Sequence, residues 1–235
     1  MTFSFCRQLR ISCGLLLAFC FSQASATAAV TSRCFGTPAH GRLENGVELP
    51  RSGANFVSYS HLAAMLGRTY VHSTVRDIML DAYAALEKDQ PGKVYQYAET
   101  GSREGGPFKP HKTHQNGLSV DFMVPVLNAE GESVHLPTHV FNRFGYDIEF
   151  DKAGHYKDYV IDYEAMAAHI VELRKSALKH GADLTRVIFD PDMQAPLFET
   201  RDGPYLKAHL NFSKKPAWVR HDEHYHVDFK LVCSP

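Results

Sequence analysis

The chain has 235 residues, of which 44% are hydrophobic and 22% charged, and its formal net charge at pH 7 is −1. This length and composition are typical of a globular protein that can bury one proper core. The nearly balanced charge, without a long basic run, argues against nucleic-acid binding.

The first 28 residues are predicted to be a cleaved secretory signal. Arg7 and Arg10 precede a short apolar run over residues 11–21, and small residues follow at 24–28. The run is too short to span a membrane, and no second apolar stretch follows it. We therefore expect an exported protein without a membrane span, in which residues 29–235 form one domain.

Only two cysteines, Cys34 and Cys233, lie outside the predicted signal, one near each end of the remaining chain. In an oxidising compartment the simplest interpretation is a disulfide that ties the two ends together. Two unpaired buried thiols are the alternative.

The first half of the domain is expected to contain one long helix and two strands. Residues 29–60 are rich in Gly, Pro, Ser and Asn, which predicts a wrapping segment with little regular structure. A helix is predicted to begin at a Ser73 cap, because apolar residues then recur on one face. Alternating patterns predict strands over 93–100 and 118–126.

The second half begins with an insertion, residues 127–160, that is rich in turns, acids and aromatics. Asp162 is predicted to cap a helix that Gly181 closes, and residues 186–190 and 225–232 are predicted strands. Because strands and helices do not alternate regularly, we expect an α+β fold with a mainly antiparallel sheet flanked by helices and long loops.

Histidines and carboxylates are concentrated in two segments, residues 111–121 and 221–228. Imidazole and carboxylate groups are the ligands of zinc hydrolases, and neither segment could close such a site alone. Each segment by itself is more often a surface feature than a metal site. Their combination favours a metal centre that the fold must assemble.

The spacing within each segment fits this interpretation. On a strand, His224 and His226 point to the same face, so one can bind the metal while the other lies beside it. Gly117 allows a turn that could bring His114 and Asp121 onto the same ion. Three protein ligands with one open position are typical of a catalytic rather than a structural zinc.

These motifs resemble the penicillin-insensitive murein endopeptidases, part of the wider metallopeptidase group named after lysostaphin, D-Ala-D-Ala carboxypeptidases and sonic hedgehog. The resemblance covers most of residues 29–235. Thr113 stands where relatives usually have serine, and the insertion at 127–160 departs most from the family pattern. The residues that carry the resemblance are Cys34-x-Gly36, Leu49-Pro50, Gly67-Arg68-x-Tyr70-Val71-His72, Gly105-Gly106-Pro107-Phe108, His111, His114-Gln115-Asn116-Gly117-Leu118, Asp121 and His221-x-x-His224-x-His226.

The resemblance implies that His114, Asp121 and His226 bind one zinc ion. It implies an active-site role for His224, which His221 would support, and we treat both as predicted catalytic residues. Some relatives hold a second metal. The residues that correspond roughly to that site, or that would support the first one, are His111, Asp151 and His155.

The family also implies a substrate and a place in the cell. The expected reaction is hydrolysis of D-alanyl–meso-diaminopimelate cross-links in peptidoglycan by metal-activated water, in the periplasm. The nearest alternative is a zinc D,D-carboxypeptidase that trims uncross-linked stem peptides. Such an enzyme would need a cation for the terminal carboxylate, and Arg103 or Arg220 could supply it. A non-catalytic periplasmic module that binds zinc or the cell wall is a third interpretation.

Overall fold

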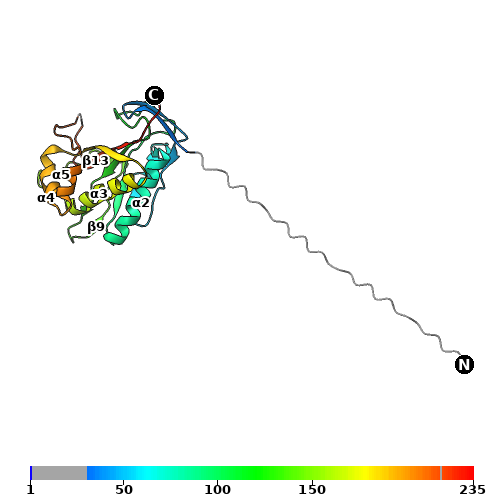
Figure 1. Ribbon diagram of the computed structural model, residues 1–235. Helices are drawn as coiled ribbons and strands as arrows, with labels where there is room; N and C mark the ends of the chain where they lie inside the picture. The colour runs from blue at the N-terminus through cyan, green and yellow to red at the C-terminus, as the bar shows by residue number, and fades with distance from the viewer. Residues whose placement is uncertain (2–30, 218) are drawn as a thin grey trace.

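The computed structural model describes Met1 and residues 31–217 and 219–235, so the predicted signal at 1–28 lies outside the segment that the structure describes. The described chain is α+β, as predicted (Figure 1). None of its described helices is both long and apolar enough to cross a bilayer.

A five-stranded sheet forms the centre of the fold, and four of its strands are antiparallel neighbours. Only β4 and β6 pair in parallel. The order across the sheet is β12 (Asp183–Ile188), β13 (His224–Lys230), β7 (Ser119–Met123), β6 (Tyr95–Tyr97) and β4 (Phe56–Ser58). The three strands predicted at 93–100, 118–126 and 225–232 are therefore present in shortened form, and the fourth begins before residue 186.

Two long helices, α2 (Ser73–Asp89) and α3 (Tyr163–Lys179), pack against each other beside this sheet (Figure 1). The ring of His169 on α3 lies 4.8 Å from Phe122 of β7 and 5.2 Å from Tyr83 of α2. The Asp162 carboxylate caps α3, as predicted, by accepting a hydrogen bond from the Ala165 backbone N–H. The helices thus cover one face of the sheet and leave the other for polar residues.

The start of α2 differs from the prediction by one residue. His72, rather than Ser73, is the N-cap residue, and its Nδ1 accepts a hydrogen bond from the Thr74 backbone N–H at 3.1 Å. An imidazole nitrogen can replace the usual hydroxyl oxygen at this position because it supplies the same lone pair.

The expectation of little regular structure over residues 29–60 is wrong in part. Tight turns there join short strands, and a single-turn helix follows. These elements are β1 (Arg33–Thr37), β2 (His40–Glu44), β3 (Val47–Glu48), α1 (His61–Met65) and β5 (Tyr70–Val71). β1 and β2 form an antiparallel hairpin that lies beside the C-terminal residues, where Phe35 bridges to Ser234 (Figure 1).

The insertion at 127–160 contributes to a small second sheet and a bent 3-10 segment. The sheet has the order β10 (His155–Tyr156), β11 (Tyr159–Ile161), β8 (Val126–Leu127) and β9 (Ser133–Val134). The bent segment is η1 (Val140–Gly145). Three further short helices were not predicted from the sequence: η2 (Pro191–Met193), α4 (Gln194–Glu199) and α5 (Gly203–His209).

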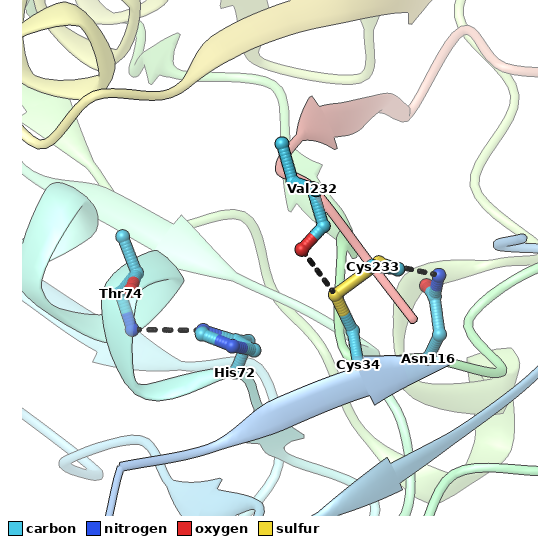
Figure 2. Close-up of a disulfide and its surroundings, with 6 residues drawn as sticks. All are labelled: Cys34, His72, Thr74, Asn116, Val232 and Cys233. Carbon is cyan, nitrogen blue, oxygen red and sulfur yellow. Dashed lines mark hydrogen bonds between the residues drawn. A yellow bond between two sulfur atoms is a disulfide. The ribbon is translucent and has the colours of Figure 1, made fainter. Parts of the chain in front are cut away.

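A disulfide between Cys34 and Cys233 joins the N-terminal hairpin to the end of the chain. Figure 2 shows it beside Asn116, whose Nδ2 lies 3.8 Å from the Cys233 sulfur. Asn116 belongs to the loop that carries His114, so the disulfide that joins the two ends of the domain also contacts that loop. The predicted pairing is confirmed, and the alternative of two free thiols is wrong.

Removing this bond should lower stability strongly. The two cysteines are 199 residues apart, and closing so long a loop is worth at most about 5 kcal/mol in the chain-entropy model. A Cys34→Ser/Cys233→Ser double variant should therefore lose several kcal/mol of unfolding free energy, measured by urea denaturation. Wild-type protein reduced with dithiothreitol is the matched control and should behave like the variant. An unchanged denaturation midpoint in both samples would contradict this expectation.

Candidate functional site

The pairing of β7 with β13 brings the two polar segments together. His226 pairs with Asp121 in an antiparallel register, and Asp228 pairs with Ser119. Paired residues point to the same face of a sheet, so these side chains share the face away from α2 and α3. The period-two pattern in the sequence placed Asp121 and His226 correctly, although it could not give their register.

A tight loop places the His114 side chain next to Asp121. His114 has a positive φ of 69°, which is uncommon for a residue with a side chain and often marks a functional site. Gly117 also has a positive φ, and a Cβ there would lie 2.7 Å from the His72 backbone nitrogen. The backbone N–H of Gln115 donates to the Pro38 carbonyl at 2.9 Å, which fixes the loop against the N-terminal hairpin.

Three nitrogen donors surround the carboxylate of Asp121. The Oδ1 atom lies 3.3 Å from Nε2 of His114 and 2.8 Å from Nδ1 of His226. The Oδ2 atom lies 3.7 Å from Nδ1 of His111. Donor atoms of His111, His114 and Asp121 all lie within 4.8 Å of one another. This group could hold a metal ion, and His226 approaches the same carboxylate from β13.

The protonation of His114 fits a metal ligand. Its Nδ1 lies 3.1 Å from the Thr100 carbonyl oxygen, which can only accept, so Nδ1 carries the proton. Its Nε2 therefore has a lone pair, is fully buried and makes no hydrogen bond. A buried lone pair without a donor is costly in a folded protein, and a cation beside Asp121 would satisfy it.

The ring of His226 is held between two carboxylates. Its Nε2 donates to Oδ1 of Asp228 at 2.8 Å, and Nδ1 faces Asp121. Although burial lowers the pKa of His226, the charge of Asp228 and hydrogen bonds to both carboxylates raise it to about 9. A cation at Nδ1 must therefore displace a proton, while Asp228 keeps the ring oriented through Nε2.

Asp121 itself stays ionised. Burial alone would raise its pKa, but the neighbouring imidazoles of His114 and His226, the second through a hydrogen bond at 2.8 Å, hold that pKa well below its usual value. The Tyr146 hydroxyl also donates to Oδ2 at 3.1 Å. The carboxylate is thus available as an anionic ligand at any ordinary pH.

His111 is tied to a second acidic group, Glu99. Nε2 of His111 hydrogen-bonds to Oε2 of Glu99, and Arg68 and the Tyr59 hydroxyl bind the same carboxylate. Burial alone would raise the pKa of Glu99, but the hydrogen bonds from His111 and Arg68 lower it to about 2. The Glu99 side chain is therefore ionised, and its carboxylate orients the ring of His111.

The two predicted catalytic histidines stand beside this group. The rings of His221 and His224 are 4.4 Å apart, and each has one nitrogen engaged: Nδ1 of His224 with Glu223 at 2.7 Å, and Nδ1 of His221 with the Val219 carbonyl at 3.0 Å. Burial lowers the pKa of His224 to about 4. Burial, together with repulsion from His224, lowers that of His221 to about 3.

A cleft of about 790 Å³ opens above these residues. His111, His221, His224 and His226 line it, whereas His114 and Asp121 are fully buried below its floor. A cation bound at Asp121 would therefore be enclosed by protein on one side and reached through the cleft on the other side. Such an arrangement suits chemistry on a molecule that enters the cleft.

Other predicted residues lie elsewhere. Asp151 and His155 have side chains that are 61% and 57% exposed, pair with each other at 3.6 Å and do not line the cleft. The structure therefore does not bring them to His111. Of the two arginines considered for a carboxypeptidase, Arg103 lies on Tyr70 outside the cleft. Arg220 lines the cleft.

Several residues of the site carry no signal in the sequence. Glu99 and Tyr146 come from segments without a motif, and Arg186 binds Asp228 at 2.5 Å from the neighbouring strand. Three acids of the C-terminal segment are each less than 5% exposed, although acidic side chains usually lie in solvent: Asp222, Glu223 and Asp228. Their position directly beside the histidine cluster was the only available signal.

No curated protein matches this chain. A protein-family model does match it over residues 34–235, which include every histidine, carboxylate and cysteine of the site described above. The family is described as penicillin-insensitive murein endopeptidase, a peptidase family that acts on peptidoglycan. Since the match covers most of the chain, the protein belongs to the penicillin-insensitive murein endopeptidase family.

Proposed function

We propose that this protein is a zinc-dependent endopeptidase that hydrolyses D-alanyl–meso-diaminopimelate cross-links in peptidoglycan, and that it works in the periplasm after export. The observation that carries this proposal is the convergence of His114, Asp121 and His226 below an open cleft, in a chain of this family. The Cys34–Cys233 disulfide supports an oxidising compartment.

In this proposal His114 binds the zinc ion through Nε2, Asp121 through its carboxylate and His226 through Nδ1. Two neutral imidazoles and one carboxylate leave a net charge of about +1 on such a site. When bound, the cation supplies Lewis-acid activation of water and of the scissile carbonyl. Thr100 and Asp228 hold the two rings in the required tautomers.

His224 is the proposed catalytic residue that does not bind the metal. It lies two positions from His226, lines the cleft and packs its ring 4.9 Å from that of Tyr146. From there it can accept a proton from the attacking water or donate to the carbonyl oxygen as negative charge develops. His221, whose Nδ1 is fixed by Val219, supports it from the adjacent position.

The proposed role of His111 is to support the centre rather than to bind the first ion. Its Nε2 is engaged by Glu99, and its Nδ1 lies farther from Asp121 than the nitrogens of His114 and His226 do. A second zinc ion would use His111. Asp151 and His155 do not line the cleft, and the proposal does not include them.

A digest of purified muropeptides tests the reaction. The mature protein is incubated with cross-linked dimers and with uncross-linked pentapeptide monomers, with and without a zinc chelator, and the products are identified by mass. We expect dimers to be converted to monomers, and we expect the chelator to stop this and added zinc to restore it.

Three outcomes would contradict the proposal. Release of D-alanine from monomers with dimers left intact would favour the D,D-carboxypeptidase. Tight muropeptide binding without cleavage, at full zinc occupancy, would favour a non-catalytic wall-binding module. Cleavage that resists complete removal of the metal would exclude the metal-dependent mechanism.

A further inference from the structure

Basic side chains are concentrated on the cleft, although the chain as a whole has a net charge of −1. Five lysines and arginines line it, against only two carboxylates, those of Glu99 and Glu223. Glu99 is bound by Arg68, and Glu223 by His224. The five basic residues, which come from segments far apart in the sequence, are Lys112, Arg143, Arg186, Lys215 and Arg220.

Two of these cations are already engaged by buried acids. Arg186 binds Asp228 at 2.5 Å, and Arg220 binds Asp222 at 2.5 Å. Both acids are less than 5% exposed, so the pairs are part of the structure around the site. These two arginines therefore stabilise the structure of the cleft lining through their ion pairs.

Arg143 and Lys215 are different, because no such acid neutralises them. Within the part of the chain that the structure describes, the only ion pair of Arg143 is with Asp147 at 3.5 Å. Both side chains are exposed, and such pairs contribute little. Lys215 is exposed and has no hydrogen bond or ion pair within the described residues. Both therefore present a charge to whatever enters the cleft.

The backbone at Arg143 is held in an unusual conformation. Arg143 and Phe144 have φ values of 50° and 59°, a left-handed conformation that is unfavourable for residues with a side chain. Asn142 holds it, since its Oδ1 accepts from the backbone N–H groups of His139 and Gly145 and its Nδ2 donates to the Pro137 carbonyl. Strain retained in this way is typical of functional segments.

We propose that Arg143 and Lys215 form a carboxylate-binding subsite that takes a free carboxylate of the peptide close to the bond that is cut. This inference rests on the proposed function. In a D-alanyl–diaminopimelate cross-link, the carbon attached to the scissile nitrogen itself bears a free carboxylate. The acceptor stem peptide also ends in a free carboxylate, at its C-terminus. Either carboxylate is an anionic group that two exposed cations in the same cleft as the histidine cluster would recognise.

The test compares three dimers: one with all carboxylates free, one amidated at the diaminopimelate carboxylate beside the scissile bond and one amidated at the acceptor's terminal carboxylate. Each is assayed with wild-type protein and with Arg143→Gln, Lys215→Gln and the double variant. KM and kcat are measured with zinc, and dissociation constants are measured by calorimetry on the metal-free protein.

Two variants serve as matched controls. Lys157→Gln removes a positive charge from another left-handed position, with φ of 53°, that does not line the cleft. Lys214→Gln removes the charge next to Lys215 at an exposed residue that is likewise outside the cleft lining. Both should leave KM unchanged for every dimer.

For the free dimer we expect the double variant to raise KM about tenfold with kcat within twofold of wild type, since two exposed charge-assisted contacts are lost. Amidation of the recognised carboxylate should raise KM equally in wild type and have no further effect on the double variant. The dimer that shows this pattern identifies which carboxylate binds. Calorimetry should rank the samples in the same order.

Equal wild-type affinity for all three dimers, by KM and by calorimetry, would overturn the subsite. So would a double variant with wild-type KM. Absence of cleavage by the zinc-loaded wild type would instead count against the proposed function, and the dissociation constants would then still decide on the subsite.

Discussion

Replacing Asp121 by asparagine is expected to remove both the bound zinc and the hydrolysis of dimers. The carboxylate is 1% exposed, and its Oδ1 atom lies between the nitrogens of His114 and His226. A neutral amide keeps the size of the side chain but loses the negative charge that attracts the ion. We expect zinc affinity to fall by more than the roughly 10–100-fold caused by changing a supporting partner.

Metal content after dialysis, measured by mass spectrometry, and circular dichroism for the fold would check this expectation. His226→Ala should likewise lose zinc. His111→Ala is the informative comparison, because it should keep the ion if His111 only supports the centre. Asp228→Asn should weaken zinc binding within the 10–100-fold range. Stoichiometric zinc in folded Asp121→Asn protein would remove Asp121 from the proposed ligand set.

Replacing His224 by alanine is expected to leave the zinc in place and to lower kcat about 10²–10⁴-fold. Groups that transfer a proton or stabilise an oxyanion contribute factors of this size. The Nδ1 atom of His224 hydrogen-bonds to Glu223, and the residue lines the cleft. Loss of the ring should therefore affect turnover rather than metal binding.

The measurement is kcat on cross-linked dimers at full zinc occupancy. His209→Ala is a suitable control, because this exposed histidine on α5 packs on Tyr205 and is absent from the cleft lining. Its kcat should equal that of wild type. A His224→Ala protein with a near-normal rate would refute the catalytic assignment, and one without zinc would make His224 part of the metal centre.

Site residues within a periodic or motif-like pattern were predictable from the sequence, whereas isolated ones were not. Asp121 and His226 lie on strands, where a period of two predicts which side chains of the same strand share a face, but the register that places one opposite the other is known only from the structure. Glu99 had no such signal, because an isolated acid at a strand end resembles any solvated one. It is recognisable only once Arg68 and His111 are seen on either side of it.

The elements of the fold also differ in how far the sequence predicts them. α2 and α3 are long and have clear apolar faces, so both were found from periodicity. The short strands over residues 33–58 were missed because glycines and prolines in that segment indicate turns. β1 and β2 pair with each other, but this hairpin is joined to the end of the chain by the Cys34–Cys233 disulfide, and Phe56 of β4 pairs with the distant Tyr95. Long-range pairing of this kind leaves no local pattern.

The position of β13 between β7 and β12 has a consequence for when the enzyme becomes active. His226 is synthesised 105 residues after its partner Asp121, and its strand must enter between two neighbours that were made earlier. A growing chain that has not reached this strand has neither His224 nor His226, so it lacks one proposed zinc ligand and the proposed catalytic residue. β13 thus completes the proposed site, and the proposed hydrolysis requires its insertion between β7 and β12.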